Sequence, residues 1–320
     1  MELPSLTELE AAADLVHRII PPTPQICWPL LSARVGAELW VKHENHTQTG
    51  AFKLRGGLVY LDDLKRAQPG IAGVITATTG NHGQSIAWAA SRLGLKAVIV
   101  VPHGNSPEKN RAMVGFGATL VEHGHDFQAA YEHAMAMAKR ENLHAVRSFH
   151  PLLVQGVASY GLELFRAVPD LDVVYVPIGL GSGICGVIAA REALGCKAEI
   201  VGVVAENAPT YALSFAAGEP VGTNSADTFA GGLAVRVPDE AALGVIRRHA
   251  ARIVTVSEDE MKAATRIIFS DTHNIAEGAG AAPLAAALQE RDRLKSKKIA
   301  VIQSGGNIDR PLFAEILTAE

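Results

Sequence analysis

Lys53 is the residue of this chain whose type and setting best suit covalent chemistry. It lies in a polar segment, residues 42–57, which follows an apolar stretch from Ala37 to Val41 and ends at two adjacent glycines. Burial against apolar neighbours disfavours the charged form of a lysine, and a neutral amine can form a Schiff base with an aldehyde. We expect Arg55 to help keep Lys53 neutral by like-charge repulsion.

Two short glycine-containing turns follow predicted strands and could bind polar groups. Residues 78–83 read TTGNHG and lead into a predicted helix, so their N–H groups could bind a carboxylate. Residues 304–307 read SGGN, and Ser304 could hydrogen-bond a heterocycle nitrogen. Ligands bind open α/β sheets at the carboxyl ends of strands, where both turns lie. Each pattern alone is equally typical of an ordinary turn.

A third turn, residues 177–186, reads PIGLGSGICG and predicts a phosphate site at a helix start. Its spacing also fits G-x-G-x-x-G, and Glu206 lies about twenty residues further on, at the end of the next predicted strand. These features are typical of dinucleotide binding, which makes an NAD-dependent oxidoreductase the alternative of another class. The turn alone does not decide which phosphate is bound.

The elements that position these turns alternate between short apolar strands and amphipathic helices. This alternation predicts an α/β fold with two open, twisted, mostly parallel sheets flanked by helices. The predicted strands are 72–77, 97–101, 119–121, 173–178, 199–204, 253–256 and 299–303. The predicted helices are 83–93, one opened by Ser106 and Pro107, 126–141, 183–194, and one opened by a capping box of Ser257 and Glu260.

Composition excludes several classes of function. The chain has 320 residues, 48% of them hydrophobic, and a formal net charge of −4 without a long basic run, which argues against a nucleic-acid partner. It has no apolar stretch of membrane-spanning length and no visible secretory signal. Three cysteines without metal-ligand spacing indicate reduced thiols and a cytoplasmic location. No histidine cluster predicts a metal site.

The motifs occur together in an order that resembles the fold-type II pyridoxal-phosphate enzymes, specifically the threonine/serine dehydratase and serine racemase family. The matching segments are 49–56 (TGAFKLRG), 80–84 (GNHGQ) and 304–307 (SGGN), with a looser match at 177–186. The resemblance implies a large pyridoxal-phosphate-binding domain of residues 1–53 and 151–320 and a small domain of residues 54–150. It also implies a homodimer, and it decides against the dinucleotide interpretation.

The resemblance implies a role for each matched residue. Lys53 is the catalytic residue, which binds pyridoxal 5'-phosphate as a Schiff base and then takes the Cα proton. The implied cofactor-binding residues are Phe52, Lys53, Asn81, Gly179, Gly181, Ser182, Gly183, Glu277 and Ser304. The implied substrate-carboxylate residues are Thr78, Gly80, Asn81 and His82.

The implied activity is that of an ammonia-lyase acting on a β-hydroxy amino acid. A serine beside the pyridine nitrogen, in place of a carboxylate, weakens the cofactor as an electron sink and favours prompt loss of the β-hydroxyl. We therefore expect a dehydratase that converts L-threonine or L-serine to a 2-oxo acid and ammonia. Its small-molecule partner is the amino acid, and 3-hydroxyaspartate and phenylserine stay open as substrates. Of the basic side chains, His43, His46 or Arg236 could favour an acidic substituent.

Departures from the family pattern limit the alternatives. Racemases of the group resemble one another in carrying a serine where this chain has Thr79, and the added methyl group restricts χ1. Serine racemase-like activity is therefore the alternative within the family. Glu206 matches one residue of a cation site found in some relatives, but Ala212 occupies the expected position of the second, so we predict no tightly bound metal. The chain ends soon after Ser304, which predicts a catabolic enzyme without a regulatory domain.

Overall fold

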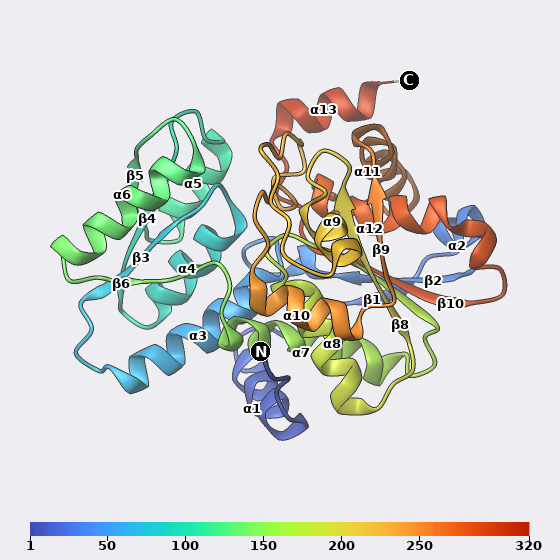
Figure 1. Ribbon diagram of the computed structural model, residues 1–320, viewed down its shortest axis with the longest axis horizontal. Coiled ribbons are helices and arrows are strands. Elements are labelled where there is room, and N and C mark those ends of the chain that lie inside the picture. Colours follow the sequence, from blue (N-terminus) through green and yellow to red (C-terminus); the bar gives the residue numbers. More distant parts are fainter. Residues whose placement is uncertain (320) are drawn as a thin grey trace.

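A computed structural model describes residues 1–319 and contains two sheets, one in each of two lobes (Figure 1). All neighbouring strands pair in parallel except β1 with β2, which confirms the predicted α/β architecture. The strands of the larger sheet, in spatial order, are β1 (Gln25–Cys27), β2 (Glu38–His43), β10 (Lys298–Gln303), β7 (Val173–Pro177), β8 (Glu199–Ala205) and β9 (Arg252–Val256). Those of the smaller sheet are β5 (Thr119–Glu122), β4 (Lys96–Val101), β3 (Gly73–Ala77) and β6 (His144–Ala145).

Helices flank both sheets, and the central strands β3, β4, β7, β8 and β10 are almost completely buried. In the first half of the chain they are α1 (Leu6–His17), α2 (Pro29–Val35), α3 (Lys53–Ala67), α4 (Asn81–Arg92), α5 (Pro107–Gly115) and α6 (Phe127–Arg140). In the second half they are α7 (Pro151–Ala167), α8 (Ser182–Leu194), α9 (Thr210–Ala217), α10 (Glu240–His249), α11 (Glu258–Thr272), α12 (Gly278–Gln289) and α13 (Arg310–Thr318). Short 3₁₀ turns span Glu44–His46 and Arg291–Arg293. Among residues 1–319, no helix is long and apolar enough to cross a membrane.

The predicted caps form as expected. Ser106 Oγ accepts a hydrogen bond from the Lys109 N–H at 3.1 Å, and Pro107 occupies the first position of α5. At α11, Ser257 Oγ accepts from the Glu260 N–H while the Glu260 carboxylate accepts from the Ser257 N–H at 2.7 Å. Both devices satisfy N–H groups that have no partner inside the helix. The other predicted helices and strands are present with ends displaced by a few residues.

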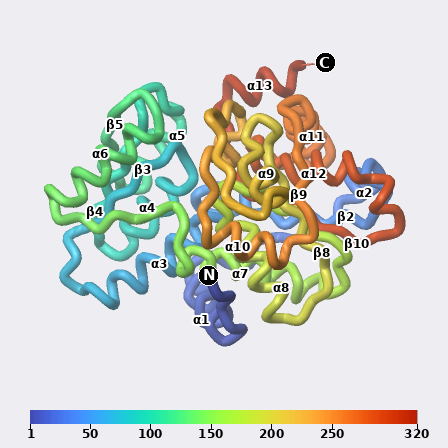
Figure 2. The backbone as a smooth tube through the Cα atoms, in the orientation of Figure 1, coloured from blue at the N-terminus to red at the C-terminus, as the bar shows by residue number. Residues whose placement is uncertain are grey.

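Helices α3 and α7 carry the chain out of the larger lobe and back into it (Figure 2). They cross at Gly56 and Gly156, where an added Cβ would lie 2.7 Å from the Leu153 carbonyl oxygen and 2.4 Å from the Arg55 carbonyl oxygen, respectively. Glycine is therefore needed at both positions for the two backbones to approach. This contact holds the start of α3, and with it Lys53, against α7.

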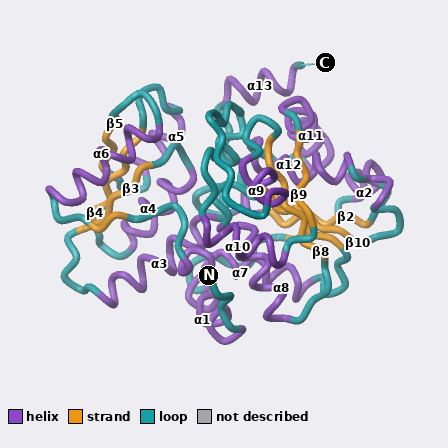
Figure 3. The backbone as a smooth tube through the Cα atoms, viewed as in Figure 1, coloured by secondary structure: helices purple, strands orange, loops and turns teal. Residues whose placement is uncertain are grey.

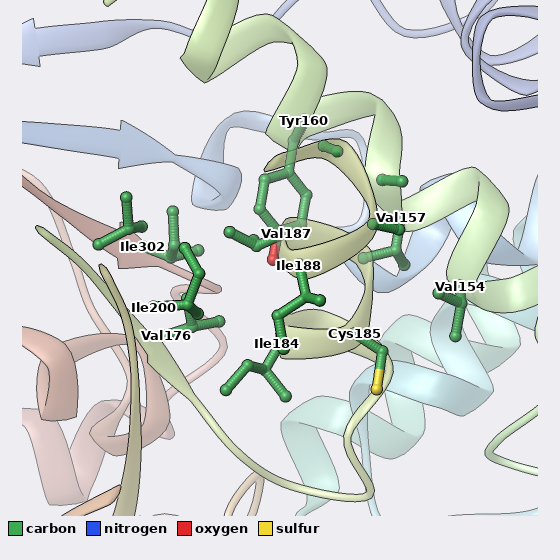
Figure 4. Packing of buried hydrophobic residues seen from close by; sticks show 14 of the residues in the cluster. Val154, Val157, Tyr160, Val176, Ile184, Cys185, Val187, Ile188, Ile200 and Ile302 are labelled. Atoms are coloured by element: carbon green, nitrogen blue, oxygen red, sulfur yellow. The ribbon is translucent and has the colours of Figure 1, made fainter. Parts of the chain in front are cut away.

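The packing of α7 against α8 forms much of the larger core. Tyr160 of α7 lies among Val187 and Ile188 of α8 (Figure 4), and its ring is almost fully buried. Its hydroxyl donates to the carbonyl oxygen of Gly183 at 3.1 Å, so the buried polar group is satisfied at the beginning of α8. The core thereby fixes the turn between β7 and α8.

A long segment without regular structure, residues 218–239, connects α9 to α10. Figure 3 shows it as a teal stretch in the middle of the molecule. Phe229 in this segment donates its N–H to the Glu258 carboxylate at 3.1 Å, and Gly232 packs against the turn that follows β7. The alternation of strands and helices did not predict this segment.

Candidate functional site

The site forms where the carboxyl ends of β2 and β10 meet. Gln303 pairs with His43 in the parallel ladder, and beyond the strands Ala51 and Gly305 form an isolated antiparallel bridge. The Phe52 N–H then donates to the carbonyl oxygen of Ser304 at 3.0 Å. This pairing brings the first residue of α3, Lys53, close to Ser304.

Lys53 is partly buried and has a lowered pKa. Its Nζ lies 5.1 Å from the centroid of the Phe52 ring, and its carbonyl oxygen accepts from Ser85 Oγ at 2.7 Å. Burial lowers the pKa of Lys53 from 10.5 to about 8, while the charge of Glu277 opposes that shift. Far more of the amine is thus unprotonated near neutral pH than in an ordinary lysine, and the unprotonated amine is the form that attacks a carbonyl.

The prediction that Arg55 keeps Lys53 neutral is wrong. The Arg55 guanidinium is fully buried and binds Glu44 at 2.7 Å and Glu163 at 2.5 Å. Glu163 also binds Lys42 Nζ at 2.5 Å, so two cations and two carboxylates form one buried network. The charge of Arg55 is neutralised there, and burial, not repulsion, accounts for the pKa of Lys53.

The turn between β7 and α8 presents an array of free N–H groups. Within residues 1–319, no acceptor is found for the backbone N–H groups of residues 179–183. Gly181 has φ of +100°, and a Cβ on Gly179 would lie 2.3 Å from the carbonyl oxygen of Gly232. Ser182 is buried as the first residue of α8. These donors converge at a helix N-terminus, an arrangement that binds phosphate.

The turn between β3 and α4 supplies a second set of donors. Thr78 Oγ1 accepts a hydrogen bond from the Gly80 N–H at 3.1 Å. The N–H groups of the next two residues, Asn81 and His82, have no acceptor among the described residues. His82 is 5% exposed, and its Nε2 has no hydrogen-bond partner. Burial and the charge of Lys53 lower the pKa of His82 from 6.5 to about 3, so its ring is neutral.

Asn81 connects the turns to each other. Its Nδ2 donates to Glu277 Oε1 at 2.7 Å, and its Oδ1 accepts from Asn307 Nδ2 at 2.8 Å. Burial raises the pKa of Glu277, whereas the charge of Lys109, the hydrogen bond from Asn81 and the charge of Lys53 lower it. The predicted residues Asn81 and Glu277 therefore lie together beside Lys53.

Ser304 is buried but keeps its hydroxyl available. Its carbonyl oxygen is used by Phe52, whereas Ser304 Oγ has no hydrogen-bond partner within residues 1–319. Phe52 stands edge-on to Tyr160, with ring centroids 6.0 Å apart, and it lines the space beside Gly183. The site thus offers the Phe52 ring, the free Ser304 hydroxyl, the Lys53 amine and the turn between β7 and α8. Together these groups suit a flat heterocycle that carries an aldehyde and a phosphate.

Lys109 lies beside the turn between β3 and α4 and was not identified from the sequence. Its Cδ lies 3.2 Å and its Nζ 3.9 Å from the position that a Cβ on Gly80 would occupy. A cation in the first turn of a helix opposes the helix dipole, and this is the sequence signal that could have identified it.

The other basic and acidic candidates are bonded to other residues or exposed. His43 Nε2 accepts from Trp28 Nε1 at 2.9 Å, and the ring of His46 bonds to Asn274. Arg236 is exposed, and Glu206 is exposed at the end of β8. Among residues 1–319, no group of three His, Cys, Asp or Glu side chains is arranged to hold a metal ion.

Comparisons with known proteins agree on one family. Residues 16–305 match the model of the pyridoxal-phosphate dependent enzyme family. The chain is 32% identical to an L-threonine ammonia-lyase of Thermotoga maritima over 98% of its own length and 78% of that protein. It is 34% identical to an L-threonine ammonia-lyase of Geobacter sulfurreducens over 95% and 75% of the respective lengths.

Solved structures extend the similarity to the fold. The processed form of threonine deaminase isoform 2 from Solanum lycopersicum superposes with a TM-score of 0.91 at 29% identity, covering 100% of this chain and 98% of that one. Maize serine racemase superposes with a TM-score of 0.92 at 26% identity, covering 98% and 97%.

Proposed function

Because this chain belongs to the pyridoxal-phosphate dependent enzyme family, we propose that it is a β-hydroxy amino acid dehydratase, an ammonia-lyase that uses Lys53. The observation that carries the proposal is the position of Lys53: it follows Phe52, whose N–H bonds to Ser304 and whose ring lies beside Gly183 of the turn with free N–H groups. L-Threonine and L-serine are the proposed substrates, supported by the similarity to L-threonine ammonia-lyases. The products are a 2-oxo acid and ammonia.

The residues present fit pyridoxal 5'-phosphate. Lys53 offers the amine that reacts with its aldehyde, and the N–H groups at Gly179, Gly181, Ser182 and Gly183 suit its phosphate. Phe52 offers an aromatic side, and the free Ser304 hydroxyl suits a ring nitrogen. The second hydrogen of Asn81 Nδ2 is available for a ring oxygen, and Glu277 lies next to it. When bound, the cofactor supplies an electron-accepting ring conjugated to the substrate nitrogen.

The chain's own residues then bind the substrate and move protons. The turn of Thr78, Gly80, Asn81 and His82 binds the substrate carboxylate through N–H groups at the start of α4. The unprotonated Lys53 amine takes the proton from Cα as a general base. Loss of this proton and of the β-hydroxyl removes one water from the substrate. Hydrolysis of the resulting enamine adds one water back, so the net products are the 2-oxo acid and ammonia.

Ser304 favours elimination over racemisation. A neutral hydroxyl does not protonate a ring nitrogen as a carboxylic acid would, so negative charge at Cα is weakly stabilised and departure of the β-hydroxyl competes well. Thr79, the alternative proton donor for the opposite face, is exposed. Its hydroxyl motivates serine racemase-like activity as the second candidate. 3-Hydroxyaspartate and phenylserine remain candidate substrates because the same residues would process them.

We further propose a cytoplasmic homodimer that has no nucleic-acid partner. This assignment rests on the family resemblance, the reduced cysteines and the net charge of −4. Light scattering of the purified protein measures the mass of the assembly, and a single mass of one chain contradicts the dimer.

The test is to replace Lys53 by alanine and to record absorbance and 2-oxo acid release. The protein loaded with cofactor is expected to show the visible band of a lysine-bound cofactor and to release 2-oxo acid from L-threonine or L-serine. Lys53→Ala is expected to lose both, whereas Lys65→Ala, on the same helix α3, is expected to keep both. A lysine-bound band that survives in Lys53→Ala overturns the assignment. A band without 2-oxo acid, together with the D-enantiomer of serine detected by chiral chromatography, favours the racemase.

A further inference from the structure

Lys109 places a positive charge over the turn that is proposed to bind the substrate carboxylate. It belongs to α5, but its side chain extends across to Gly80 at the start of α4, with Nζ 3.9 Å from the position of an added Gly80 Cβ. Asn81 and His82 are the first two residues of α4, and their backbone N–H groups have no acceptor among the described residues. The Lys109 ammonium and the N-terminus of α4, both of which are positively polarised, therefore lie side by side.

This arrangement is electrostatically unfavourable unless an anion joins it. Lys109 lies in the first turn of α5, where the helix dipole disfavours a cation. Within residues 1–319, Lys109 forms no ion pair. Its charge acts on Glu277 without a direct contact between the two, and burial raises the pKa of that carboxyl group. The ammonium is thus left for a ligand.

Two contacts hold the first turn of α5, which carries Lys109, in place. Ser106 Oγ, which caps α5, is 2.5 Å from Asp309 Oδ1. The Arg310 N–H donates to Glu108 Oε2 at 3.2 Å. These contacts tie the start of α5 to the segment that follows Ser304 and Asn307, so Lys109 is held above Gly80.

We propose that Lys109 is a specificity-determining residue whose ammonium pairs with the substrate carboxylate bound at the turn of residues 78–82. This inference rests on the proposed function, since it assigns a residue to the substrate subsite of that reaction. The site then selects amino acids with a free carboxylate and rejects their amides and esters. A charged group paired in this way forms a hydrogen bond roughly twice as strong as a neutral one.

The experiment compares L-alanine with L-alaninamide, in which a neutral carboxamide replaces the carboxylate; neither compound carries a β-hydroxyl to lose. Affinities are measured by spectral titration of the cofactor-loaded protein. For Lys109→Met, the Kd of L-alanine is expected to rise roughly tenfold or more, because a charge-assisted hydrogen bond is lost. The Kd of L-alaninamide is expected to stay within about twofold, because no carboxylate is present to pair.

Two variants separate recognition from folding. Lys109→Arg keeps the charge and is expected to retain most of the L-alanine affinity. Arg111→Met removes an exposed cation from the same helix and is expected to change neither affinity. Equal losses for both ligands in Lys109→Met, or an unchanged L-alanine affinity, overturn the inference.

Turnover provides the separate test of the dehydratase proposal. If the wild-type protein releases 2-oxo acid from no hydroxy amino acid, yet Lys109→Met loses L-alanine affinity selectively, the dehydratase proposal fails and the role of Lys109 stands. If turnover is found and the selective loss is not, the role of Lys109 fails alone.

Discussion

Lys53 is a lysine surrounded by groups that pull its pKa in opposite directions. Removal from solvent disfavours its ammonium form, whereas the Glu277 carboxylate favours it. The nearest cation along the chain, Arg55, is occupied with Glu44 and Glu163. The reactivity of Lys53 therefore depends on burial and on the charge of one carboxyl group, and both can be tested.

The rate at which the cofactor-free protein captures pyridoxal phosphate should rise with pH, with a midpoint at about pH 8. The amine reacts only when unprotonated, and burial lowers its pKa to about 8, so half of it is unprotonated at that pH and the rate levels off roughly one pH unit higher. Glu277→Gln removes the carboxylate that raises the pKa of Lys53 and should move the midpoint to lower pH. Stopped-flow absorbance at a series of pH values measures both midpoints.

A matched control for this profile is Glu258→Gln, which alters a carboxylate at the start of α11 and should leave the midpoint unchanged. A midpoint near 10.5 would show that burial does not depress the pKa of Lys53. A shift of the Glu277→Gln midpoint to higher pH would contradict the sign of the carboxylate's influence.

Motifs identified most of the candidate site but not its electrostatics. Lys53, Asn81 and Ser304 were predicted because each belongs to a short pattern with a recognisable turn or helix start. The neutralisation of Arg55 depends on Glu44 and Glu163, and Glu163 is more than a hundred residues away, so no local pattern reveals it. Lys109 does carry a local signal, a cation in the first turn of a helix, but its closeness to Gly80 arises only when α5 packs beside α4.

Among the elements, those with local signals were predicted best. Caps at Ser106 and Ser257, and apolar runs such as Val173–Pro177, fix the ends of helices and strands through neighbouring residues. Residues 218–239 have no periodicity, so their packing against the phosphate turn could not be predicted. The close approach of Gly232 to Gly179 places this segment against that turn.

Gly179→Ala should weaken cofactor binding through this contact. The new Cβ would lie 2.3 Å from the Gly232 carbonyl oxygen, so one of the two backbones must move. Overpacking of this kind costs roughly 1–3 kcal/mol, which corresponds to a rise of about 5- to 150-fold in the Kd of pyridoxal phosphate. Equilibrium titration of the cofactor-free protein measures the change.

Gly231→Ala is the matched control, because an added Cβ there meets nothing within 4 Å. It should bind the cofactor as the wild-type protein does. Equal affinities for Gly179→Ala and Gly231→Ala would mean that the 218–239 segment does not support the phosphate turn.

The arrangement of the two lobes depends on contacts between residues far apart in the sequence, which a local strand or helix pattern does not predict. All strands of the smaller sheet lie between residues 73 and 145, and the larger sheet uses strands from both ends of the chain. The proposed boundaries, 1–53 with 151–320 and 54–150, stay a prediction. Helices α3 and α7 start at these boundaries and pack closely at Gly56 and Gly156. Away from this crossing, α5 of the smaller lobe contacts residues 309–310 of the larger lobe.

Asp309→Ala should loosen α5 and weaken substrate binding without unfolding either lobe. Asp309 contacts Ser106 Oγ but does not cap its own helix, α13, so alanine removes mainly the contact between the lobes. Loss of a hydrogen bond to a charged group costs about 1.5–3 kcal/mol when buried, and less at this partly buried position. Hydrogen exchange of the amides of residues 107–115 should therefore accelerate roughly tenfold, or about 1.4 kcal/mol. KM should rise with it, because Lys109 is carried by α5.

Asp292→Ala removes an exposed carboxylate paired only with Lys295 and should change neither quantity. Unchanged exchange in Asp309→Ala would show that the contact between Ser106 and Asp309 does not hold α5 in place.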